Sequence, residues 1–538
     1  MNQATEQFRA IAKAAIDDCL EQDPVGATWL GDHRFDARLP DYSAEAIATF
    51  EEKIDQHLTA LDAVDDVELL TEDLVDLEIL RAHLLKVQFD LTQVQEHKWN
   101  PMVWNPGTAL HLLESRDFAP RDERRRNLES RAEHIPGFLE QARATLKDMS
   151  AIHVETAIAQ LQGTLALVDS LNLDQQISDS VSEQIDWLTD GLPLATRSPR
   201  LGPELYAGIL WHALDDSTDV ETLYATAHDH LGLVGDRMRK IAIEYLAHLK
   251  IESVGDPVRE ALDHIATTNV VTNENVLDHV RSAVASARAF TIEHNIVTVP
   301  EIDTEVIEMP EIHRGVAVAY CDAPGPLERA SVPTFVAVAP TPDDWTPERV
   351  LSFYREYNAV QIHDLTIHEA IPGHVLQLAV GNSGTGQSDT RRFGFSGAFV
   401  EGWAVYSEEV MINAGYSPQA NLASSLAIRL QQLKMQMRMI INTILDIGVH
   451  SKDMSEHQAM DLMMQRGYQE EGEAAGKWRR ALLTSGQLPT YFVGYLAVKG
   501  LAEDLKVMHP DWSLQQIHDL LLSFGSPAPR HVRELVGL

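Results

Sequence analysis

One short segment constrains what this chain can fold into more than any other: it reads HEAIPGH, from His368 to His374. The segment sets two imidazoles and a carboxylate close together in a chain that otherwise follows helical patterns. In the common zinc-binding motif H-E-x-x-H, the two histidines lie four residues apart on one helix face. His368 and His374 are six residues apart, a rotation of roughly 240° on an ideal helix, so an unbroken helix cannot bring them together.

Pro372 and Gly373 supply a break between the two histidines. Proline removes a backbone donor and clashes with the preceding turn, and glycine tolerates unusual dihedral angles. A bulge or wide turn here could swing His374 back toward His368. Neutral imidazoles bind zinc, and an adjacent Glu can take the proton of the water that the metal activates. The segment therefore predicts a zinc site with Glu369 as general base, unless Pro-Gly simply ends a helix and both histidines are ordinary.

A helical, apolar segment that is interrupted by acids follows at FVEGWAVYSEE, residues 399–409. Burying a Glu in such a segment is costly unless the carboxylate is paired or bound to a metal. Two His and a Glu from a following helix form a catalytic zinc ligand set that leaves one position open for water. We therefore predict Glu401 as the third ligand and Glu408, two turns further along the same face, as an acceptor for a ligand imidazole. The alternatives are an acid at a helix start for Glu401 and a solvated position for Glu408.

Taken together, the motifs resemble those of a known bacterial family. After HEAIPGH come Gln377, FVEGWAVYSEE, the segment DIGVH at residues 446–450 and the segment GQLPTYFVG at residues 486–494. This order is similar to the family called domain of unknown function 885, which resembles the gluzincin metallopeptidases; their relatives include helical oligopeptidases, dipeptidyl carboxypeptidases and carboxypeptidases. The resemblance is specific over about residues 310–500 and looser upstream. It implies one zinc ion held by His368, His374 and Glu401, with Glu369 as base, and it carries over no substrate.

Hydrolysis of a carbonyl also needs a donor that stabilises the developing oxyanion, commonly a Tyr hydroxyl or a His ring nitrogen. Tyr491 and His450 are the candidates, because both lie in segments that resemble the family and neither is a predicted ligand. Asp446 lies four residues before His450 and could orient it from the same helix face. The alternatives are a core Tyr packed by its ring, a His that caps a helix after Gly448, and a core or capping Asp.

A peptidase that trims C-termini must hold a carboxylate, and both oxygens of that group can be bound by one guanidinium. Most arginines in the C-terminal half are expected to be surface charges or members of internal pairs. We favour Arg480, although family members often carry an aromatic residue directly after the corresponding Arg, where this chain has Ala481. The sequence does not choose among the candidates, which are Arg391, Arg392, Arg429, Arg438 and Arg480.

Two runs that precede the HEAIPGH segment have the composition of strands. They are residues 315–321 and 334–339, which are rich in β-branched and aromatic side chains and bounded by proline. They predict a small sheet near the active site. Its edge could receive a substrate backbone as an added strand, or the runs could form a purely structural hairpin.

Charge and cysteine content restrict the class of protein. The chain of 538 residues has 43 basic and 81 acidic residues, so we expect no nucleic-acid partner, because attraction to phosphates needs a basic surface. Its two cysteines are too few for a disulfide scaffold or a thiolate zinc cluster. The first residues lack the basic and apolar regions of a leader peptide, and no run approaches the roughly 20 apolar residues that cross a bilayer. These features predict a cytoplasmic protein without a membrane partner, although a mature exported protein would look the same, and they leave the oligomeric state open.

Most of the chain alternates apolar and charged residues at the helical period. We predict a mainly α fold with an N-terminal helical region over residues 1–290 and a catalytic, zinc-binding lobe over residues 291–538. The resemblance implies one continuous, two-lobed, zincin-like body. The segments predicted as helical are residues 3–21, 44–64, 70–97, 121–149, 152–171, 220–250, 256–267, 346–380, 398–414, 418–449, 455–470, 473–485, 491–507 and 513–523.

These features together predict a zinc metallopeptidase that hydrolyses short peptides as a carboxypeptidase, dipeptidyl carboxypeptidase or oligopeptidase. A metal-dependent hydrolase of an ester or a non-peptide amide would use the same ligands. A helical binding protein without catalysis could also keep the scaffold, although the presence of Glu369 argues against it.

Overall fold

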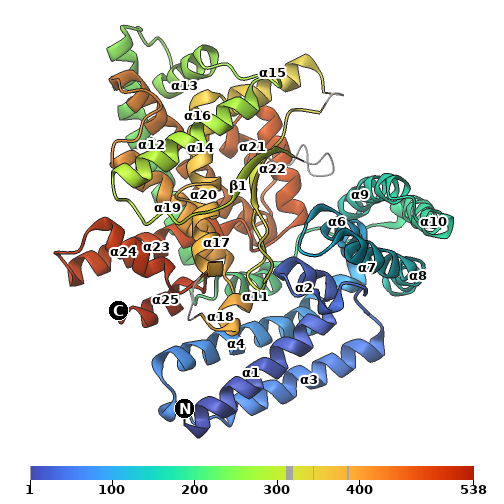
Figure 1. Cartoon of the computed structure of the whole chain (residues 1–538). Coiled ribbons are helices and arrows are strands. Elements are labelled where there is room, and N and C mark those ends of the chain that lie inside the picture. The colour runs from blue at the N-terminus through green and yellow to red at the C-terminus, as the bar shows by residue number, and fades with distance from the viewer. Residues whose placement is uncertain (1, 310–318, 343–344, 384–386) are drawn as a thin grey trace. The chain divides into compact units, whose positions relative to one another are not determined.

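The computed structural model describes residues 2–309, 319–342, 345–383 and 387–538. Within these residues the chain is mainly helical and has a three-stranded sheet (Figure 1), which confirms the predicted mainly α fold with a small β element. No helix of the described part is both long enough and apolar enough to cross a membrane. The chain forms two compact units: one consists of Met1–Leu201, Pro324–Val332 and Gln387–Gly394, and the other of Gly202–Ala323, Pro333–Gly386 and Phe395–Leu538.

The first unit is built of helices that begin at ordinary N-terminal signals. The side chain of Asn2 accepts a hydrogen bond from the Thr5 amide at the start of α1, and Asp23 caps α2 with Pro24 in its first turn. The helices of this unit are α1 (Gln3–Gln22), α2 (Pro24–Leu30), α3 (Ala44–Asp62), α4 (Thr71–Phe89), α5 (Glu96–Trp99), α6 (Gly107–Ser115), α7 (Arg121–Glu133), α8 (Ile135–Thr145), α9 (Ala151–Ser170), α10 (Gln175–Gly191) and α18 (Asp389–Phe393).

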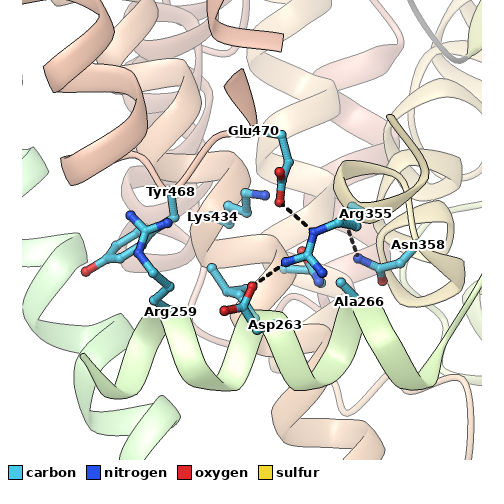
Figure 2. A pocket seen from close by; sticks show the side chains of 10 residues that line it. Arg259, Asp263, Ala266, Arg355, Asn358, Lys434, Tyr468 and Glu470 are labelled. Carbon is cyan, nitrogen blue, oxygen red and sulfur yellow. Dashed lines mark hydrogen bonds and ion pairs between the residues drawn. The ribbon is translucent and has the colours of Figure 1, made fainter. Parts of the chain in front are cut away.

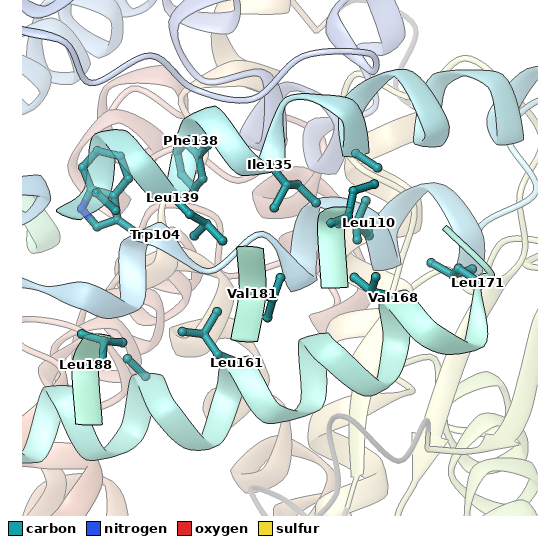
Figure 3. Close-up of a cluster of buried hydrophobic side chains, with 14 of the residues drawn as sticks. Trp104, Leu110, Ile135, Phe138, Leu139, Leu161, Val168, Leu171, Val181 and Leu188 are labelled. Carbon is teal, nitrogen blue, oxygen red and sulfur yellow. The ribbon is translucent and has the colours of Figure 1, made fainter. Parts of the chain in front are cut away.

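Figure 3 shows one apolar core of this unit, where α8, α9 and α10 pack together. Ile135, Phe138 and Leu139 repeat at the three- and four-residue spacing that keeps side chains on one helix face. Each such side chain contributes about 1.5–3 kcal/mol when it is fully removed from water. A second core joins α1, α3 and α4 and includes Leu327 and Phe393, so the two short segments that are distant in sequence belong to this unit.

The second unit surrounds α20, a helix of 30 residues whose side chains are buried along most of its length. The elements of this unit are α11 (Pro203–Leu214), α12 (Val220–Leu249), α13 (Pro257–Thr268), α14 (Val276–Glu293), β1 (Thr304–Glu308), β2 (Ala319–Asp322), β3 (Thr334–Val338), α15 (Pro347–Glu356), α16 (Ala359–Glu369), α17 (His374–Ser383), α19 (Gly397–Asn413), α20 (Leu422–Ser451), α21 (Glu456–Asp461), α22 (Glu471–Leu483), α23 (Pro489–Met508), α24 (Leu514–Leu522) and α25 (Pro529–Leu535). The helices α11, α12 and α13 and most of α14 belong to this unit although they precede residue 291.

The sheet has the strand order β1-β3-β2. β1 pairs with β3 in parallel, with Thr304 opposite Thr334, and β2 pairs with β3 antiparallel, with Ala319 opposite Val338. β3 is the predicted run at residues 334–339, and β2 is the end of the run predicted at 315–321, whose residues 315–318 lie outside the described part. β1 was not predicted, because its sequence TEVIE is short and two of its five residues, Glu305 and Glu308, are acidic.

Two long segments with a helical period are divided in the structure, the second of them at the stop signal His134–Gly137 of the sequence. Residues 346–380 are divided among α15, α16 and α17. The side chain of Asn358 begins α16 by accepting hydrogen bonds from the amides of Val360 and Gln361. Residues 121–149 form α7 and α8, with Pro136 in the first turn of the second helix. Apolar periodicity continues across such breaks, so it does not locate them.

The crossing of α19 and α23 is unusually close. A Cβ atom on Gly402 would overlap the backbone of Gly494, and a Cβ atom on Gly494 would overlap the carbonyl of Ala398. Only glycine permits this backbone approach. Glu401 precedes Gly402, and Tyr491 lies one helical turn before Gly494, so the crossing brings two predicted site residues to the same region.

Candidate metal centre

The turn between α16 and α17 determines where His374 lies. The Gly373 amide donates to the carbonyl of Ile367 at 3.0 Å, and the Leu376 amide donates to the carbonyl of Ala370 at 3.2 Å. A Cβ atom on Gly373 would overlap the carbonyl of His368, so the turn requires glycine. The indole of Trp403 on α19 donates to the Pro372 carbonyl at 2.8 Å and fixes the turn against that helix. This break, rather than a continuous helix, places His374 at the start of α17.

His368, His374 and Glu401 come together in the structure. Oε2 of Glu401 lies 3.3 Å from Nε2 of His368 and 3.5 Å from Nε2 of His374. The ligand atoms of the three residues all lie within 4.8 Å of one another. Tetrahedral zinc with bonds of about 2.0–2.1 Å separates its ligand atoms by roughly 3.3 Å. The separations of Glu401 from both imidazoles therefore suit an ion between the three side chains.

The state of the buried ligand atoms also suits a cation. Oε2 of Glu401, the oxygen that faces both imidazoles, is buried and has no hydrogen-bond partner within the described residues. Burial by itself raises the pKa of Glu401, but the two imidazoles outweigh it and hold the pKa below its ordinary value. Burial lowers the pKa of His368, and the carboxylates of Glu401 and Glu408 outweigh it and raise the pKa well above its usual range. Positive charge is thus stabilised where the three side chains meet, which is what a metal ion would supply.

Glu408 contacts Nδ1 of His368, whereas Glu401 faces Nε2 of the same ring. The sequence predicts Glu408 as the acceptor for a ligand imidazole. Its Oε1 lies 2.8 Å from Nδ1 of His368, and both residues are buried. A carboxylate that accepts from Nδ1–H leaves Nε2 of the ring free to bind a metal and fixes the orientation of the ring.

Glu369 lies beside the sheet. Its Oε2 accepts a hydrogen bond from the Cys321 amide of the edge strand β2 at 3.1 Å. Glu369 and His368 line a pocket of about 140 Å³ that is open to solvent. Ala319 of β2 and Tyr491 of α23 line the same pocket. The predicted base, a predicted ligand and the strand edge therefore border one space.

Tyr491 lies close to the ligand set. Its ring centroid is 6.4 Å from that of His368, with an angle of 20° between the rings, and its hydroxyl accepts from Nε2 of Gln487 at 3.3 Å. Burial and the charge of Glu401 raise the pKa of Tyr491 above its ordinary value, so the hydroxyl keeps its proton and can donate.

His450 and Asp446 lie in a different environment. Nε2 of His450 contacts the Thr484 carbonyl at 3.0 Å, and its ring stacks on Tyr206. Oδ2 of Asp446 accepts from the Tyr206 hydroxyl at 2.9 Å and from the Gly486 amide at 2.8 Å. Neither residue is among those that line the pocket. Both residues are buried within α20, which continues past Gly448 to Ser451, and Tyr491 is the better-placed donor.

The candidate arginines differ in the groups that their side chains contact. Arg391 pairs with Asp76 at 2.8 Å, Arg429 donates to Asn413 at 2.7 Å, and Arg392 donates to the Pro326 carbonyl at 3.3 Å. Arg438 lines the pocket but contacts Glu473. Arg480 also lines the pocket, and its Nη2 donates to Oε1 of Gln487 at 2.7 Å.

Sequence reasoning missed one cation of this pocket, Lys477 of α22. Its position three residues before Arg480 puts both side chains on the same helix face, which was the available signal. Burial of a lysine in a polar helix could not be inferred from the sequence, because the helices that cover it are distant in the chain.

Comparisons with known proteins place this geometry in a family. The model of a family described as bacterial protein of unknown function, DUF885, matches residues 24–536. The chain belongs to the DUF885 family. No curated protein matches it in sequence.

Solved structures resemble this DUF885 protein over its whole length. A protein from Shewanella oneidensis, described as a lipoprotein of unknown function, has a TM-score of 0.82 and 28% identity, with 98% of this chain and 99% of that chain covered. Another protein described as a lipoprotein, from Colwellia psychrerythraea, has a TM-score of 0.80 and 16% identity, with 100% and 99% covered. An M32 carboxypeptidase from Deinococcus radiodurans R1 has a TM-score of 0.40 and 10% identity, with 100% and 95% covered, a likeness too weak to support a conclusion.

These neighbours correct one prediction. The sequence predicted a cytoplasmic protein, and two structures similar over almost all of the chain are of proteins described as lipoproteins. That prediction is wrong. It depended on the first residues of the sequence, and these do not distinguish a cytoplasmic protein from an exported one.

Proposed function

We propose that this DUF885 protein is a zinc-dependent hydrolase that cleaves peptide bonds in short peptides. The convergence of His368, His374 and Glu401 beside the pocket that Glu369 lines is the observation that supports this proposal. Two imidazoles and one carboxylate are a zinc ligand set typical of hydrolases, and a carboxylate next to a ligand is suited to act as base.

His368, His374 and Glu401 would hold the ion. Zinc in such a site acidifies a water molecule and polarises the carbonyl group of the substrate. Glu369 accepts the proton of the attacking water and delivers it to the leaving amine. The Tyr491 hydroxyl donates a hydrogen bond to the oxygen of the substrate carbonyl as negative charge develops there.

The position of the strand β2 beside Glu369 and the pocket also suits a peptide substrate. The Cys321 amide of β2 donates to Glu369, and Ala319 lines the pocket. A peptide bound in this pocket would lie beside β2, with a carbonyl group near the base and the predicted ligands.

We also propose that the protein acts outside the cytoplasm, as an exported or membrane-anchored enzyme. Support comes from the protein described as a lipoprotein that is 28% identical over 98% of this chain. Short peptides in the cell envelope would then be its substrates.

A mixed peptide library analysed by mass spectrometry, with and without a chelator, tests the proposed reaction. The wild-type protein is expected to cleave peptides, to lose activity in the chelator and to regain it with zinc. Glu369→Gln is expected to bind the metal and to lose about 100- to 10,000-fold in kcat, because the proton acceptor is removed while the ligands stay.

Two results would contradict this account. Unchanged hydrolysis by Glu369→Gln would exclude Glu369 as the base. A wild-type protein that hydrolyses esters or other amides in a metal-dependent way, but no peptide of the library, would belong to a different class of hydrolase.

A further inference from the structure

Lys477 is a buried cation that forms no ion pair with any acid of the described residues. Its side chain lies on α22 and lines the pocket that His368 and Glu369 border, and only 8% of the residue is exposed. Within the part of the chain that the structure describes, no side chain or backbone group makes a hydrogen bond or an ion pair with its ammonium group. A buried ammonium group without a partner costs free energy, which an incoming anion would offset.

Arg480 lies one helical turn further along α22 and lines the same pocket. The guanidinium of Arg480 donates a hydrogen bond to the neutral amide of Gln487. None of the carboxylates in the described residues forms an ion pair with Arg480. Arg438, the third cation of the pocket, differs because it contacts Glu473 and the Tyr357 hydroxyl. Among the residues that the structure describes, two of the three cations therefore form no ion pair with an acid, in a chain with 81 acidic and 43 basic residues.

The electrostatic environment agrees with this geometry. Burial and the neighbouring charges of Arg438 and Arg480 lower the pKa of Lys477 to about 7, although Glu473 and Glu401 act in the opposite direction. Positively charged groups lie close together here, and their repulsion disfavours the charged form of Lys477. A carboxylate in the pocket would stabilise the charged form of Lys477.

Another pocket of the same unit contains cations that form ion pairs within the protein (Figure 2). It is lined by Arg259, Arg355 and Lys434. Arg355 pairs with Asp263 and with Glu470, the latter at 3.2 Å, and Lys434 pairs with Glu356 at 2.9 Å. Acids of the chain itself compensate the positive charges of Arg355 and Lys434, and Arg259 is exposed and donates to the Met464 carbonyl at 3.0 Å.

We propose that Lys477 and Arg480 bind a carboxylate of the substrate, and that this carboxylate is the C-terminus of the peptide. The inference rests on the proposed function, because it places the carboxylate in the pocket that the base and a ligand border. The guanidinium of Arg480 can bind both oxygens, and Lys477 adds a second charge in a desolvated position. The protein would then remove residues from the C-terminal end of peptides.

Binding measured by calorimetry tests this inference independently of turnover. The protein used is the zinc-loaded full chain with Glu369→Gln, and the ligands are short peptides with a free or an amidated C-terminus. Each form is made with Ala or with Glu near the C-terminal end, so that a terminal carboxylate and a side-chain carboxylate are distinguished. The free acid is expected to bind about 10- to 100-fold more tightly than the amide, as for the loss of a hydrogen bond to a charged group.

Variants identify the residues that make this difference. Lys477→Met and Arg480→Met, each added to Glu369→Gln, are expected to remove most of the preference for the free acid and to leave the affinity for the amide unchanged. Arg479→Met is the matched control, because it removes a positive charge from an exposed position of the same helix and should keep the full preference. Lys477→Met is expected to keep or raise the melting temperature, because it removes an unpaired buried charge.

The outcomes separate the two proposals. Equal binding of free acid and amide, or a preference that survives both substitutions, would overturn the carboxylate site. A preference that follows Glu near the end rather than the free terminus would overturn C-terminal recognition. If the wild-type protein cleaves no peptide but the preference is present and depends on Lys477 and Arg480, the proposed reaction fails while the carboxylate site stands. If Lys477→Met does not fold, Arg480→Met decides.

Discussion

Glu408 and Glu409 are neighbours on α19, and they show how the environment assigns different roles to identical side chains. Glu408 is buried against Nδ1 of His368, at 2.8 Å. Glu409 points elsewhere, to Lys499 at 3.0 Å and to the Tyr495 hydroxyl at 2.5 Å. The first contact orients a candidate ligand, and the second ties α19 to α23.

Replacing Glu408 should therefore weaken metal binding. Glu408→Gln is expected to lower the affinity for zinc by about 10- to 100-fold, because a neutral amide orients the imidazole less well and does not raise its basicity. Competition with a chelating indicator measures this affinity. Glu409→Gln is the matched control and should bind zinc as the wild-type protein does; equal affinities for all three proteins would show that Glu408 does not support His368.

The sequence allowed some of the candidate site residues to be predicted and not others. The spacing within HEAIPGH, the Pro-Gly break and the acids of residues 399–409 indicated His368, His374 and Glu401, which the structure brings together. Their chemistry is local to short motifs. The partners of His450 and Lys477 depend on helices that are distant in the chain, so sequence patterns could not distinguish a structural His from an oxyanion donor or reveal an unpaired cation.

At the scale of elements, the crossing of α19 and α23 positions the site. Glu401 and Tyr491 lie next to the glycines that allow the close approach, and the charge of Glu401 acts on Tyr491. Any side chain at Gly494 would push the two helices apart. Sequence analysis found both helices but could not pair them, because the small residues that face each other are separated by about ninety positions.

Two glycines of α23 provide a matched test of this crossing. Gly494→Ala is expected to reduce the free energy of unfolding by about 1–3 kcal/mol, because the added methyl group meets backbone atoms that cannot move away. Gly500→Ala has open space around the new methyl group and should stabilise the helix by about 0.5–1 kcal/mol. Urea denaturation measures both. Equal stabilisation by the two substitutions would show that the close approach does not constrain α23.

At the scale of the whole molecule, the helical period of the sequence predicted the mainly α fold but not how distant segments fold together. The short segments 324–332 and 387–394 interrupt the second unit in sequence and belong to the first unit in space. Glu328, in one of them, lies 2.9 Å from His33. Long-range returns of this kind leave no periodic signal. The location of the protein was likewise predicted wrongly, and the similar structures corrected it.

The proposed function depends on one zinc ion that binds between His368, His374 and Glu401. Elemental analysis of the purified full-length protein after incubation with zinc and gel filtration tests it most directly. We expect about one zinc ion per chain in the wild-type protein and in Glu369→Gln, and little zinc in His374→Ala and Glu401→Ala, with all four proteins folded by circular dichroism. A folded wild-type protein without zinc, or equal zinc in all four proteins, would contradict the account.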